Sequence, residues 1–302
     1  MTAKNHVVVG LGEVLWDLLP GGKQLGGAPT NFAYITKLLG DNGVVASRVG
    51  ADDLGREARQ ALEKLGLPAA NLQLDLAHPT GTVKVQLDAA GQPKFEISEN
   101  VAWDFLAWTA EWNALASEAD AICFGSLAQR SPVSHKTIRE FVKAARPSAT
   151  RIFDVNLRQA FFCAEVLVES LKRADIMKLN DDELPRVMAL LGIAHRNEES
   201  SAESLLRTFS LKLVSVTRGA NGSLLVNNSG SHHHPGYPMK VADTIGAGDA
   251  FTAALVHQYL RGASLAAMND AANRVGSWVA SQIGGTPAPN ATQLRDVFAA
   301  NG

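Results

Sequence analysis

From residue 121 to residue 226 the sequence alternates between short apolar runs and longer segments with helical periodicity. The predicted strands cover residues 121–124, 151–155, 176–179, 213–216 and 223–226, and the predicted helices cover about 134–145, 161–173, 183–191 and 202–209. Strands that alternate with helices in this way form a mostly parallel sheet, with right-handed crossovers and helices on both faces. The chain is therefore predicted to be an α/β protein whose ligands bind beyond the carboxyl ends of the strands.

One segment does not fit this alternation. Residues 82–87 alternate strictly between apolar and polar side chains, and the alternation resumes through Phe95 and Ile97 after a predicted turn at residues 88–91. This pattern is typical of an amphipathic antiparallel hairpin, which cannot belong to a parallel sheet buried on both faces. We expect one α/β domain over residues 1–302, with a small antiparallel sheet inserted from about 76–104 and residues 13–24 as a candidate second part. The insertion could cover a site, pair with another subunit or decorate the surface.

The remaining elements are less regular. We predict strands at 7–10 and 44–46 and a polar loop at 48–55. We also predict four helices: one that ends near Leu39, one over 56–65, one that follows Asp249 and one over about 264–281. No internal repeat, low-complexity segment or interdomain linker is evident, which agrees with a single domain.

The composition fits a globular protein of the cytoplasm. Of 302 residues, 46% are hydrophobic and 19% are charged, and the formal net charge is −2. Such a chain buries a large core, and its near-neutral charge argues against nucleic acid or a polybasic membrane surface as a partner. The two cysteines, Cys123 and Cys163, lie in apolar surroundings, which argues against a disulfide framework. With no basic leader and no apolar run of about 20 residues, we expect a small-molecule ligand rather than a membrane.

Two carboxylates bracket a glycine-rich turn at Asp243-Thr244-Ile245-Gly246-Ala247-Gly248-Asp249, and a helix is predicted directly after it. A turn that leads into a helix leaves backbone N–H groups unpaired, and the helix dipole adds about half a positive charge there. The turn is therefore a candidate anion site. Asp249 stands at its edge, where a carboxylate would repel a bound phosphate. It is either a group that does chemistry or the N-cap of the helix.

A second glycine turn, Gly26-Gly27-Ala28-Pro29-Thr30-Asn31, opens the helix that ends near Leu39. Asn31 lies in the first turns of that helix, so its amide is expected to project toward the same space as the carboxylate of Asp17. Donors and acceptors that converge on one point suit a polyol, whose hydroxyl groups need both. Taken singly, a surface aspartate and a capping asparagine are the more common meanings of these two residues.

Polar clusters follow three predicted strands, at 154–158, 178–183 and 217–222, where parallel sheets bind ligands. Gly10-Leu11-Gly12 resembles the start of a dinucleotide-binding fingerprint, but position 15, where the third glycine belongs, is leucine. The tract His232-His233-His234 predicts an exposed loop or strand end rather than a metal site. Adjacent residues of an extended segment point to alternate sides, and no nearby cysteine or glutamate completes a ligand set.

The two glycine turns, in this order and more than 200 residues apart, resemble the N-terminal and C-terminal signatures of the ribokinase-like (pfkB) carbohydrate kinase family over essentially the whole chain. Asn180-x-x-Glu183 resembles the N-x-x-E element that the family places near Mg²⁺ and phosphate. Within the family the chain is most similar to fructokinases, through Gly12-Glu13-x-Leu15-x-Asp17-x-x-Pro20, Asp154-x-Asn156-Leu157-Arg158 and Pro235-Gly236-Tyr237. Ribokinases tend to have Asn-x-Asp at residues 15–17, whereas 2-keto-3-deoxygluconate kinases share much of the pattern.

The resemblance implies ATP-dependent transfer of the γ-phosphoryl group to a sugar hydroxyl, with fructose as the first candidate and a sugar acid or ribose as alternatives. In the implied site Asp249 is the general base, and Gly246, Ala247 and Gly248 form an anion hole with Arg158 beside it. The sugar is implied to bind to Asp17, Gly27, Asn31 and Asn156. ATP is implied to bind to Asn180, Thr217, Gly219, Gly222 and Asn273. Glu183 is implied to hold Mg²⁺ through water, and Asp243, Ile245 and Gly284 to hold a monovalent cation such as K⁺. The hairpin is implied to be a lid, and pairing of two such lids in a homodimer is left as an alternative.

Two hypotheses from other classes stand beside this one. A non-catalytic sugar- or nucleotide-binding regulatory protein of the same family would have lost the base or the anion turn, and both are present here. A nicotinamide oxidoreductase is disfavoured by the missing third glycine.

Overall fold

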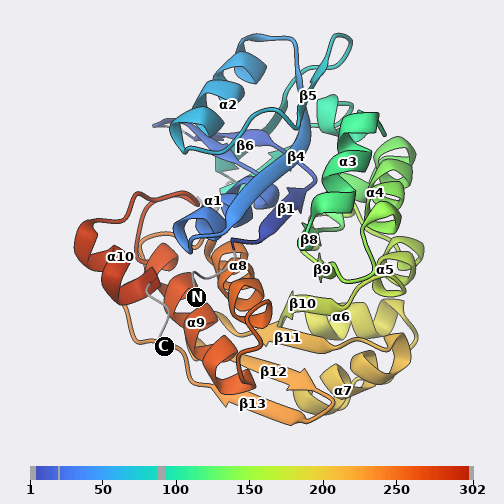
Figure 1. The fold of residues 1–302 in the computed structure, drawn as a ribbon, viewed down its shortest axis with the longest axis vertical. Coiled ribbons are helices and arrows are strands. Elements are labelled where there is room, and N and C mark those ends of the chain that lie inside the picture. Colours follow the sequence, from blue (N-terminus) through green and yellow to red (C-terminus); the bar gives the residue numbers. More distant parts are fainter. Residues whose placement is uncertain (1–4, 20, 88–92, 299–302) are drawn as a thin grey trace.

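The computed structural model describes residues 5–19, 21–87 and 93–298. Its large sheet has nine strands in the order β13-β12-β11-β10-β9-β8-β1-β4-β5 (Figure 1). The strands are β1 (Val7–Leu11), β4 (Asn42–Gly50), β5 (Leu72–Asp75), β8 (Ala121–Phe124), β9 (Thr150–Asp154), β10 (Ile176–Asn180), β11 (Leu213–Thr217), β12 (Ser223–Asn227) and β13 (Gly230–His234). Neighbouring strands are parallel except in the pairs β11–β12 and β12–β13. The predicted α/β class with a mostly parallel sheet is confirmed.

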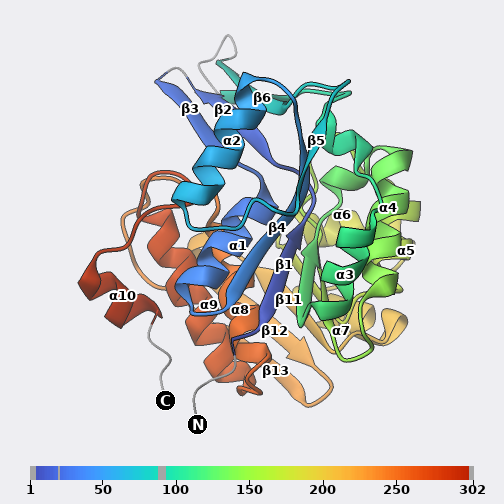
Figure 2. The same cartoon turned by 45° about the horizontal axis from the view of Figure 1, so that its top comes forward.

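Helices cover both faces of this sheet (Figures 1 and 2). On one face lie α1 (Ala28–Leu38), α2 (Asp53–Lys64), α8 (Ala247–Tyr259) and α9 (Leu265–Ala280), and on the other lie α3 (Ala110–Glu118), α4 (Pro132–Ala144), α5 (Ala164–Leu171), α6 (Glu183–Leu190) and α7 (Glu198–Phe209). The last helix, α10 (Ala291–Phe298), packs Phe298 against Trp278 of α9. Short 3₁₀ turns occur at η1 (Ala102–Phe105), η2 (Leu127–Gln129) and η3 (Gly219–Asn221).

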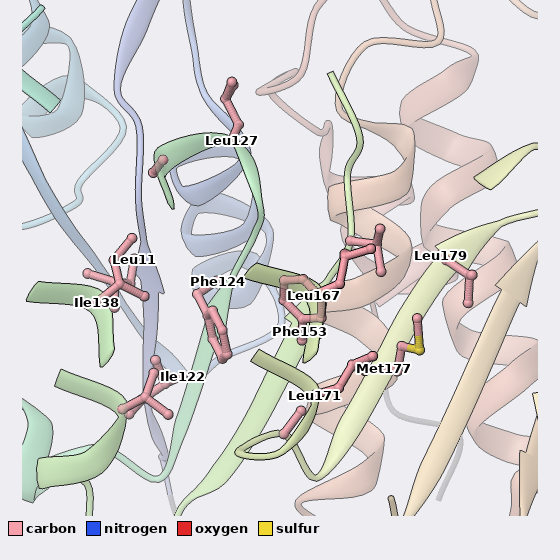
Figure 3. Packing of buried hydrophobic residues seen from close by; sticks show 14 of the residues in the cluster. Leu11, Ile122, Phe124, Leu127, Ile138, Phe153, Leu167, Leu171, Met177 and Leu179 are labelled. Carbon is pink, nitrogen blue, oxygen red and sulfur yellow. The ribbon is translucent and has the colours of Figure 1, made fainter. Parts of the chain in front are cut away.

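The sheet separates two apolar cores. In the core under α3–α7, strand residues such as Phe153 and Met177 pack against Leu167 of α5 (Figure 3). Successive side chains of a strand point to opposite faces, so Ile152 and Ile176 belong to the other core, under α1, α8 and α9. The same alternation directs residues 154 and 178 toward α8. These two positions are charged, which matters for the site described below.

A second, smaller sheet lies beside α2 at one end of the molecule (Figure 2). It consists of β2 (Leu15–Leu19), β3 (Gly22–Gly26), β6 (Gly81–Leu87) and β7 (Pro93–Ile97), in the order β3-β2-β6-β7. The pairs β2–β3 and β6–β7 are antiparallel, and β2 and β6 join the two hairpins as a parallel pair. Trp16 of β2 ties the sheet to α2 by donating a hydrogen bond to the Leu54 carbonyl, 2.9 Å away. The predicted hairpin is confirmed, and its predicted turn at 88–91 lies outside the described residues.

The prediction of a polar loop at residues 48–55 was wrong in its first half. Strand β4 continues to Gly50, because the unforeseen strand β5 pairs with it from Ser47 to Gly50. The polar Arg48 fits in a strand since its guanidinium pairs with Asp75 of β5, at 3.0 Å. Helix α2 also begins earlier than predicted, where Asp52 caps it by accepting a hydrogen bond from the Gly55 N–H. The sequence prediction also lacked α3, α10 and β13.

Candidate active site

The glycine turn at residues 246–248 forms the N-terminus of α8. Gly246 is the N-cap residue, with φ 75°, a left-handed conformation that glycine adopts without strain. A Cβ atom there would also lie 2.5 Å from the Cα of Gly285, so the turn packs directly on the backbone at Gly285. The N–H groups of the first helical turn have no partner within the helix. With only glycine and alanine around them, they are open to an anion.

Asp249 is the third residue of α8 and not its cap. The alternative interpretation of Asp249 as the N-cap is therefore excluded, because Gly246 occupies the cap position and no side chain caps it. Asp249 instead accepts a hydrogen bond through Oδ2 from the Asn31 amide, at 2.8 Å. Asn31 lies in the first turns of α1, so this bond joins the two glycine turns that the sequence singled out.

The surroundings of Asp249 adjust its basicity. Burial, together with the negative charge of Asp154, raises the pKa of Asp249 to about 6, although Asn31, Lys178 and Arg158 act in the opposite direction. A carboxyl group with this pKa is ionised at neutral pH, yet it is a better proton acceptor than an ordinary aspartate. The arrangement suits a general base.

Asp249 faces a pocket of about 360 Å³, its open mouth included. The pocket lies where β1, β8 and β9 end, at the carboxyl edge of the large sheet as predicted. Its apolar lining consists of Leu11, Ala28, Pro29, Phe32, Cys123, Phe124 and Leu127, and its polar lining of Glu13, Asp154, Asn156 and Asp249, with Gly125 between them. A small molecule bound there would contact both apolar side chains and carboxyl groups.

Glu13 is a buried carboxyl group in the loop between β1 and β2. It accepts a hydrogen bond through Oε1 from the N–H of Ala28, the first residue of α1, at 3.2 Å. The close fit of this loop also accounts for Gly27, where a Cβ atom would lie 2.3 Å from the Glu13 carbonyl oxygen. Burial raises the pKa of Glu13 to about 7, although hydrogen bonds from backbone N–H groups act against this.

A buried ion pair lies behind the α8 N-terminus. The Lys178 ammonium donates to Asp154 Oδ1 at 3.1 Å, and both side chains are less than a tenth exposed. Thr252 of α8 donates to the other oxygen of Asp154 at 2.9 Å. A Cβ atom at Gly248 would lie 3.1 Å from the Lys178 Nζ, so the ammonium sits directly beneath the turn.

The Asn180-x-x-Glu183 element joins two loops at the start of α6. The Glu183 oxygens accept hydrogen bonds from the N–H groups of Leu157, at 2.7 Å, and Asn180, at 2.9 Å. The Asn180 side chain returns a bond by accepting from the Glu183 N–H at 2.8 Å. The loop held in this way contains Asn156, whose φ is 50°, and the exposed Arg158. Each Glu183 oxygen keeps a lone pair with which it could bind water around a metal ion.

The residues expected around a monovalent cation do lie together. Asp243 accepts hydrogen bonds from the N–H groups of Ile245, at 3.0 Å, and Gly284, at 3.1 Å. Burial and the charge of Asp243 raise the pKa of Asp17 to about 6, so Asp17 lies near this cluster. The amide of Asn31 bonds to Asp249, and the expectation that Asn31 and Asp17 face the same sugar stays a prediction.

The residues expected to border ATP gather around the β11–β12 connection. Thr217 ends β11, Gly219 starts η3 with φ 54°, and Gly222 has φ 79°. A Cβ atom at Gly222 would lie 2.0 Å from the His234 carbonyl, which leaves no room for another residue. Asn273 of α9 donates a hydrogen bond to Ser223 Oγ at 2.7 Å, which places its amide beside this connection.

Comparison with known proteins assigns the family. Residues 20–292 match the sequence profile described as the pfkB family carbohydrate kinase, which is most of the chain. The chain belongs to this family. It is a sugar kinase, that is, a phosphotransferase with an alcohol group as acceptor.

Several relatives of this pfkB kinase cover nearly its full length. It is 31% identical over 268 residues to a fructokinase of Salmonella typhimurium, which spans 85% of this chain and 84% of the relative. Among solved structures, an uncharacterized sugar kinase of Pyrococcus horikoshii in complex with ATP has 28% identity and a TM-score of 0.80, over 96% of this chain and 97% of that one. A fructokinase of Vibrio cholerae O395 with fructose, ADP and a calcium ion bound has 25% identity and a TM-score of 0.81, over 98% of this chain and 99% of that one.

Other predicted features of the kinase have simpler outcomes. The three histidines alternate along β13 as expected: His232 and His234 lie near Asn269 and Asp270 of α9, and His233 lies near Glu199 of α7. Within the described part of the chain, no group of three or more His, Cys, Asp or Glu side chains is arranged to hold a metal ion. Both cysteines are free. No helix in that part is long and apolar enough to cross a bilayer.

Sequence reasoning gave no role to Glu13, Lys178 or Thr252, and it quoted Asp154 only as part of a motif. One signal was available for Lys178, since a lysine in the middle of an apolar strand is unusual. Glu13 was marked only as part of the fructokinase-like motif and Thr252 not at all, because the roles of both depend on partners far away in the chain.

Proposed function

We propose that this chain transfers the γ-phosphoryl group of ATP to a hydroxyl group of fructose, with Asp249 as the general base. The observation that supports the proposal most is the bond between Asn31 and Asp249, since the Asp249 carboxylate lies in the first turn of α8 and also lines the pocket. In phosphoryl transfer a protein chiefly positions the reactants and balances charge. This geometry supports both tasks.

The chemical step follows from these positions. The sugar hydroxyl, oriented by Asn31 and Asp17, gives its proton to Asp249 as its oxygen attacks the γ-phosphorus. The new O–P bond forms while the bond to the bridging oxygen of ADP breaks, and that oxygen keeps the electron pair. The N–H groups of residues 246–248 donate hydrogen bonds to the transferred phosphoryl oxygens. Arg158 adds positive charge at the mouth of the site.

The residues present also suit Mg²⁺ and ATP. When bound, Mg²⁺ would neutralise charge on the phosphate oxygens, and Asn180 and Glu183 would hold it through water. Thr217, Gly219, Gly222 and Asn273 would border the base and ribose, and Gly219, where an added Cβ would meet nothing within 4 Å, leaves the backbone open to a flat ring. Asp243, Ile245 and Gly284 would hold a monovalent cation next to the anion turn.

Two observations favour fructose over a sugar acid. The fructokinases of Salmonella typhimurium and Vibrio cholerae O395 are relatives over most of their length, and the latter has fructose bound. In this chain the acidic side chains of Glu13, Asp154 and Asp249 line the pocket, and no lysine or arginine among the described residues does, so the carboxylate of a sugar acid would find no cationic partner in the lining. A 2-keto-3-deoxygluconate-type kinase is the alternative.

We further propose that the small sheet closes over the sugar as a lid. It carries Asp17 on β2, and its strand β3 brings Gln24 within contact of Gly284 beside the anion turn. Closure would exclude water, which competes with the sugar as phosphoryl acceptor. Pairing of two such sheets in a homodimer belongs to the same proposal, and sedimentation with and without fructose tests it.

The substitution Asp249→Asn tests the role of the base. We expect kcat to fall by about 10³-fold or more, while ADP still binds with nearly unchanged affinity. The exposed Asp53→Asn serves as the matched control and should keep full activity. Turnover of Asp249→Asn within tenfold of the unmodified protein would exclude Asp249 as base.

The substrate is tested separately, with a panel of fructose, ribose, 2-keto-3-deoxygluconate and related sugars in a coupled assay for ADP. Fructose should give the highest kcat/KM. A higher value for ribose or for the sugar acid would refute the choice of fructose while leaving the kinase assignment intact.

A further inference from the structure

Lys178 and Asp154 occupy positions that the fold otherwise fills with apolar side chains. They are register partners on the neighbouring parallel strands β10 and β9, and both point toward α8. The residues two positions earlier on each strand, Ile176 and Ile152, belong to the apolar core on that face. A charged pair therefore interrupts an apolar stripe near the carboxyl ends of the strands, at the last residue of β9 and two residues before the end of β10, behind the candidate active site.

Stability does not account for this ion pair. Buried ion pairs are often no more stabilising than apolar side chains of similar volume. The position of Lys178 is also electrostatically unfavourable, because its ammonium group lies beneath Gly248 in the first turn of α8, where the helix dipole is positive. A cation belongs at the other end of a helix. Its presence at this end makes sense if an anion binds there.

The ammonium group is fixed in place but not fully used. Among the described residues, Asp154 is its one hydrogen-bond partner, and an ammonium has three N–H donors. Asp154 is itself held by Thr252 of α8, so the pair cannot turn away. Burial opposes the charge, but Asp154, Glu183 and Asp249 together raise the pKa of Lys178, which therefore stays protonated.

We propose that Lys178 is a positioning residue for phosphoryl transfer: held by Asp154, its ammonium group puts a fixed positive charge behind the α8 N-terminus, where the transferred phosphoryl group meets Asp249. This inference rests on the proposed function of the same site. Lys178 takes up and releases no proton. The proton of the sugar hydroxyl still goes to Asp249, the new O–P bond forms at the sugar oxygen, and the electron pair of the broken bond leaves with ADP.

The charge of Lys178 acts on Asp249 among several others. The groups that act on the Asp249 carboxylate are Glu13 from the β1–β2 loop, Asn31 from α1, Asp154 from β9, Arg158 from the following loop and Lys178 from β10. Lys178 and Asp154 have opposite effects on this carboxylate. Removing one charge or the other should therefore shift the pH dependence of catalysis in opposite directions, which loss of a merely structural contact would not do.

The test uses three variants of the full chain. Lys178→Gln removes the positive charge and keeps a donor for Asp154, Asp154→Asn removes the negative charge, and the double variant removes both without leaving an unpaired buried charge. For each we would measure kcat and KM for sugar and ATP between pH 5 and 9, and thermal unfolding. The double variant keeps the test decisive if Lys178→Gln fails to fold.

We expect kcat of Lys178→Gln to fall about 100-fold, with KM for the sugar changed little. The acid limb of its kcat/KM profile should move up by about one pH unit, and that of Asp154→Asn should move down. The double variant should show a limb near that of the unmodified protein and a kcat that stays low. Limbs that move together or not at all, or a double variant with full kcat, would overturn the proposal.

A second measurement separates this inference from the proposed function. With ¹³C-labelled aspartate, the Asp249 carboxyl signal is identified by its loss in Asp249→Asn, and its titration is followed in each variant without substrate. If the protein phosphorylates no sugar, the proposed function fails, but opposite shifts of this titration would still establish the action of Lys178 and Asp154 on Asp249. Unshifted titrations would refute it even in an active kinase.

Discussion

Glu13 offers a direct test of whether buried carboxyl groups in the site lower the stability of the folded protein. It is a buried carboxyl group that accepts a hydrogen bond from the Ala28 N–H, and burial raises its pKa from 4.5 to about 7. The folded protein therefore keeps a proton on Glu13 that the unfolded chain loses near pH 4.5. Since the folded state binds more protons between these two values, stability falls as pH rises through this window.

The size of the effect follows from the same two values. Each pH unit between the unfolded and folded pKa corresponds to 1.36 kcal/mol, so ionised Glu13 costs about 3 kcal/mol at pH 8. Glu13→Gln removes this cost and keeps an oxygen that can accept from Ala28. We expect the variant to unfold about 5 °C above the unmodified protein at pH 8, and the difference to vanish near pH 4.5.

Differential scanning calorimetry from pH 4 to 8 measures this, with Glu118→Gln, an exposed residue at the end of α3, as the control that should show no pH-dependent difference. Asp17 and Asp249 titrate in the same window, but both remain in the variant, so the comparison isolates Glu13. A difference that is constant with pH, or one that grows toward acid, would refute the argument that burial of Glu13 opposes its charge.

Two further predictions concern packing and the far end of α8. Gly285→Ala would place a Cβ atom 2.4 Å from Asn31 Oδ1, so we expect about tenfold lower kcat in the coupled assay, whereas Gly21→Ala, with open space around it, should keep full activity. Asp41 is buried, which favours its neutral form, but its bond to His257 and other hydrogen bonds hold its pKa well below the ordinary value. Asp41→Asn should therefore destabilise the protein by about 3 kcal/mol at pH 7, and urea denaturation should show this loss shrinking as pH falls below about 4, where the unmodified protein loses the same contribution.

The parts of the fold that depend on local sequence could be predicted. The runs at 121–124 and 176–179 are buried on both faces, and their short length between segments with helical periodicity identifies them as strands. The two glycine turns were visible because few other residues tolerate their conformation and close contacts. Strand β5 was not predicted: its Leu74 is exposed, and its strand character comes from pairing with β4.

The candidate site could be predicted only in part, for a related reason. Asn31 and Asp249 were each identified, but their bond could not be, because 218 residues separate them. Asp249 was also equally consistent with a cap until the helix start was known. Glu13 and Lys178 act through distant partners, and no sequence window that contains one of them contains its partner.

The distribution of buried charge makes the strongest argument that these residues form one device. Glu13, Asp154, Lys178 and Glu183 are all buried, and each lies within three residues of the carboxyl end of strand β1, β9 or β10. Each costs free energy unless it is paired, and the raised pKa of Glu13 shows that its cost is not fully offset by its partners. A chain selected for stability alone would place apolar side chains at these positions, as this chain does two residues earlier with Ile152 and Ile176. Under the proposed function Mg²⁺, ATP and the sugar complete this site together, so we expect the free protein to gain stability from adding all three and little from the sugar alone.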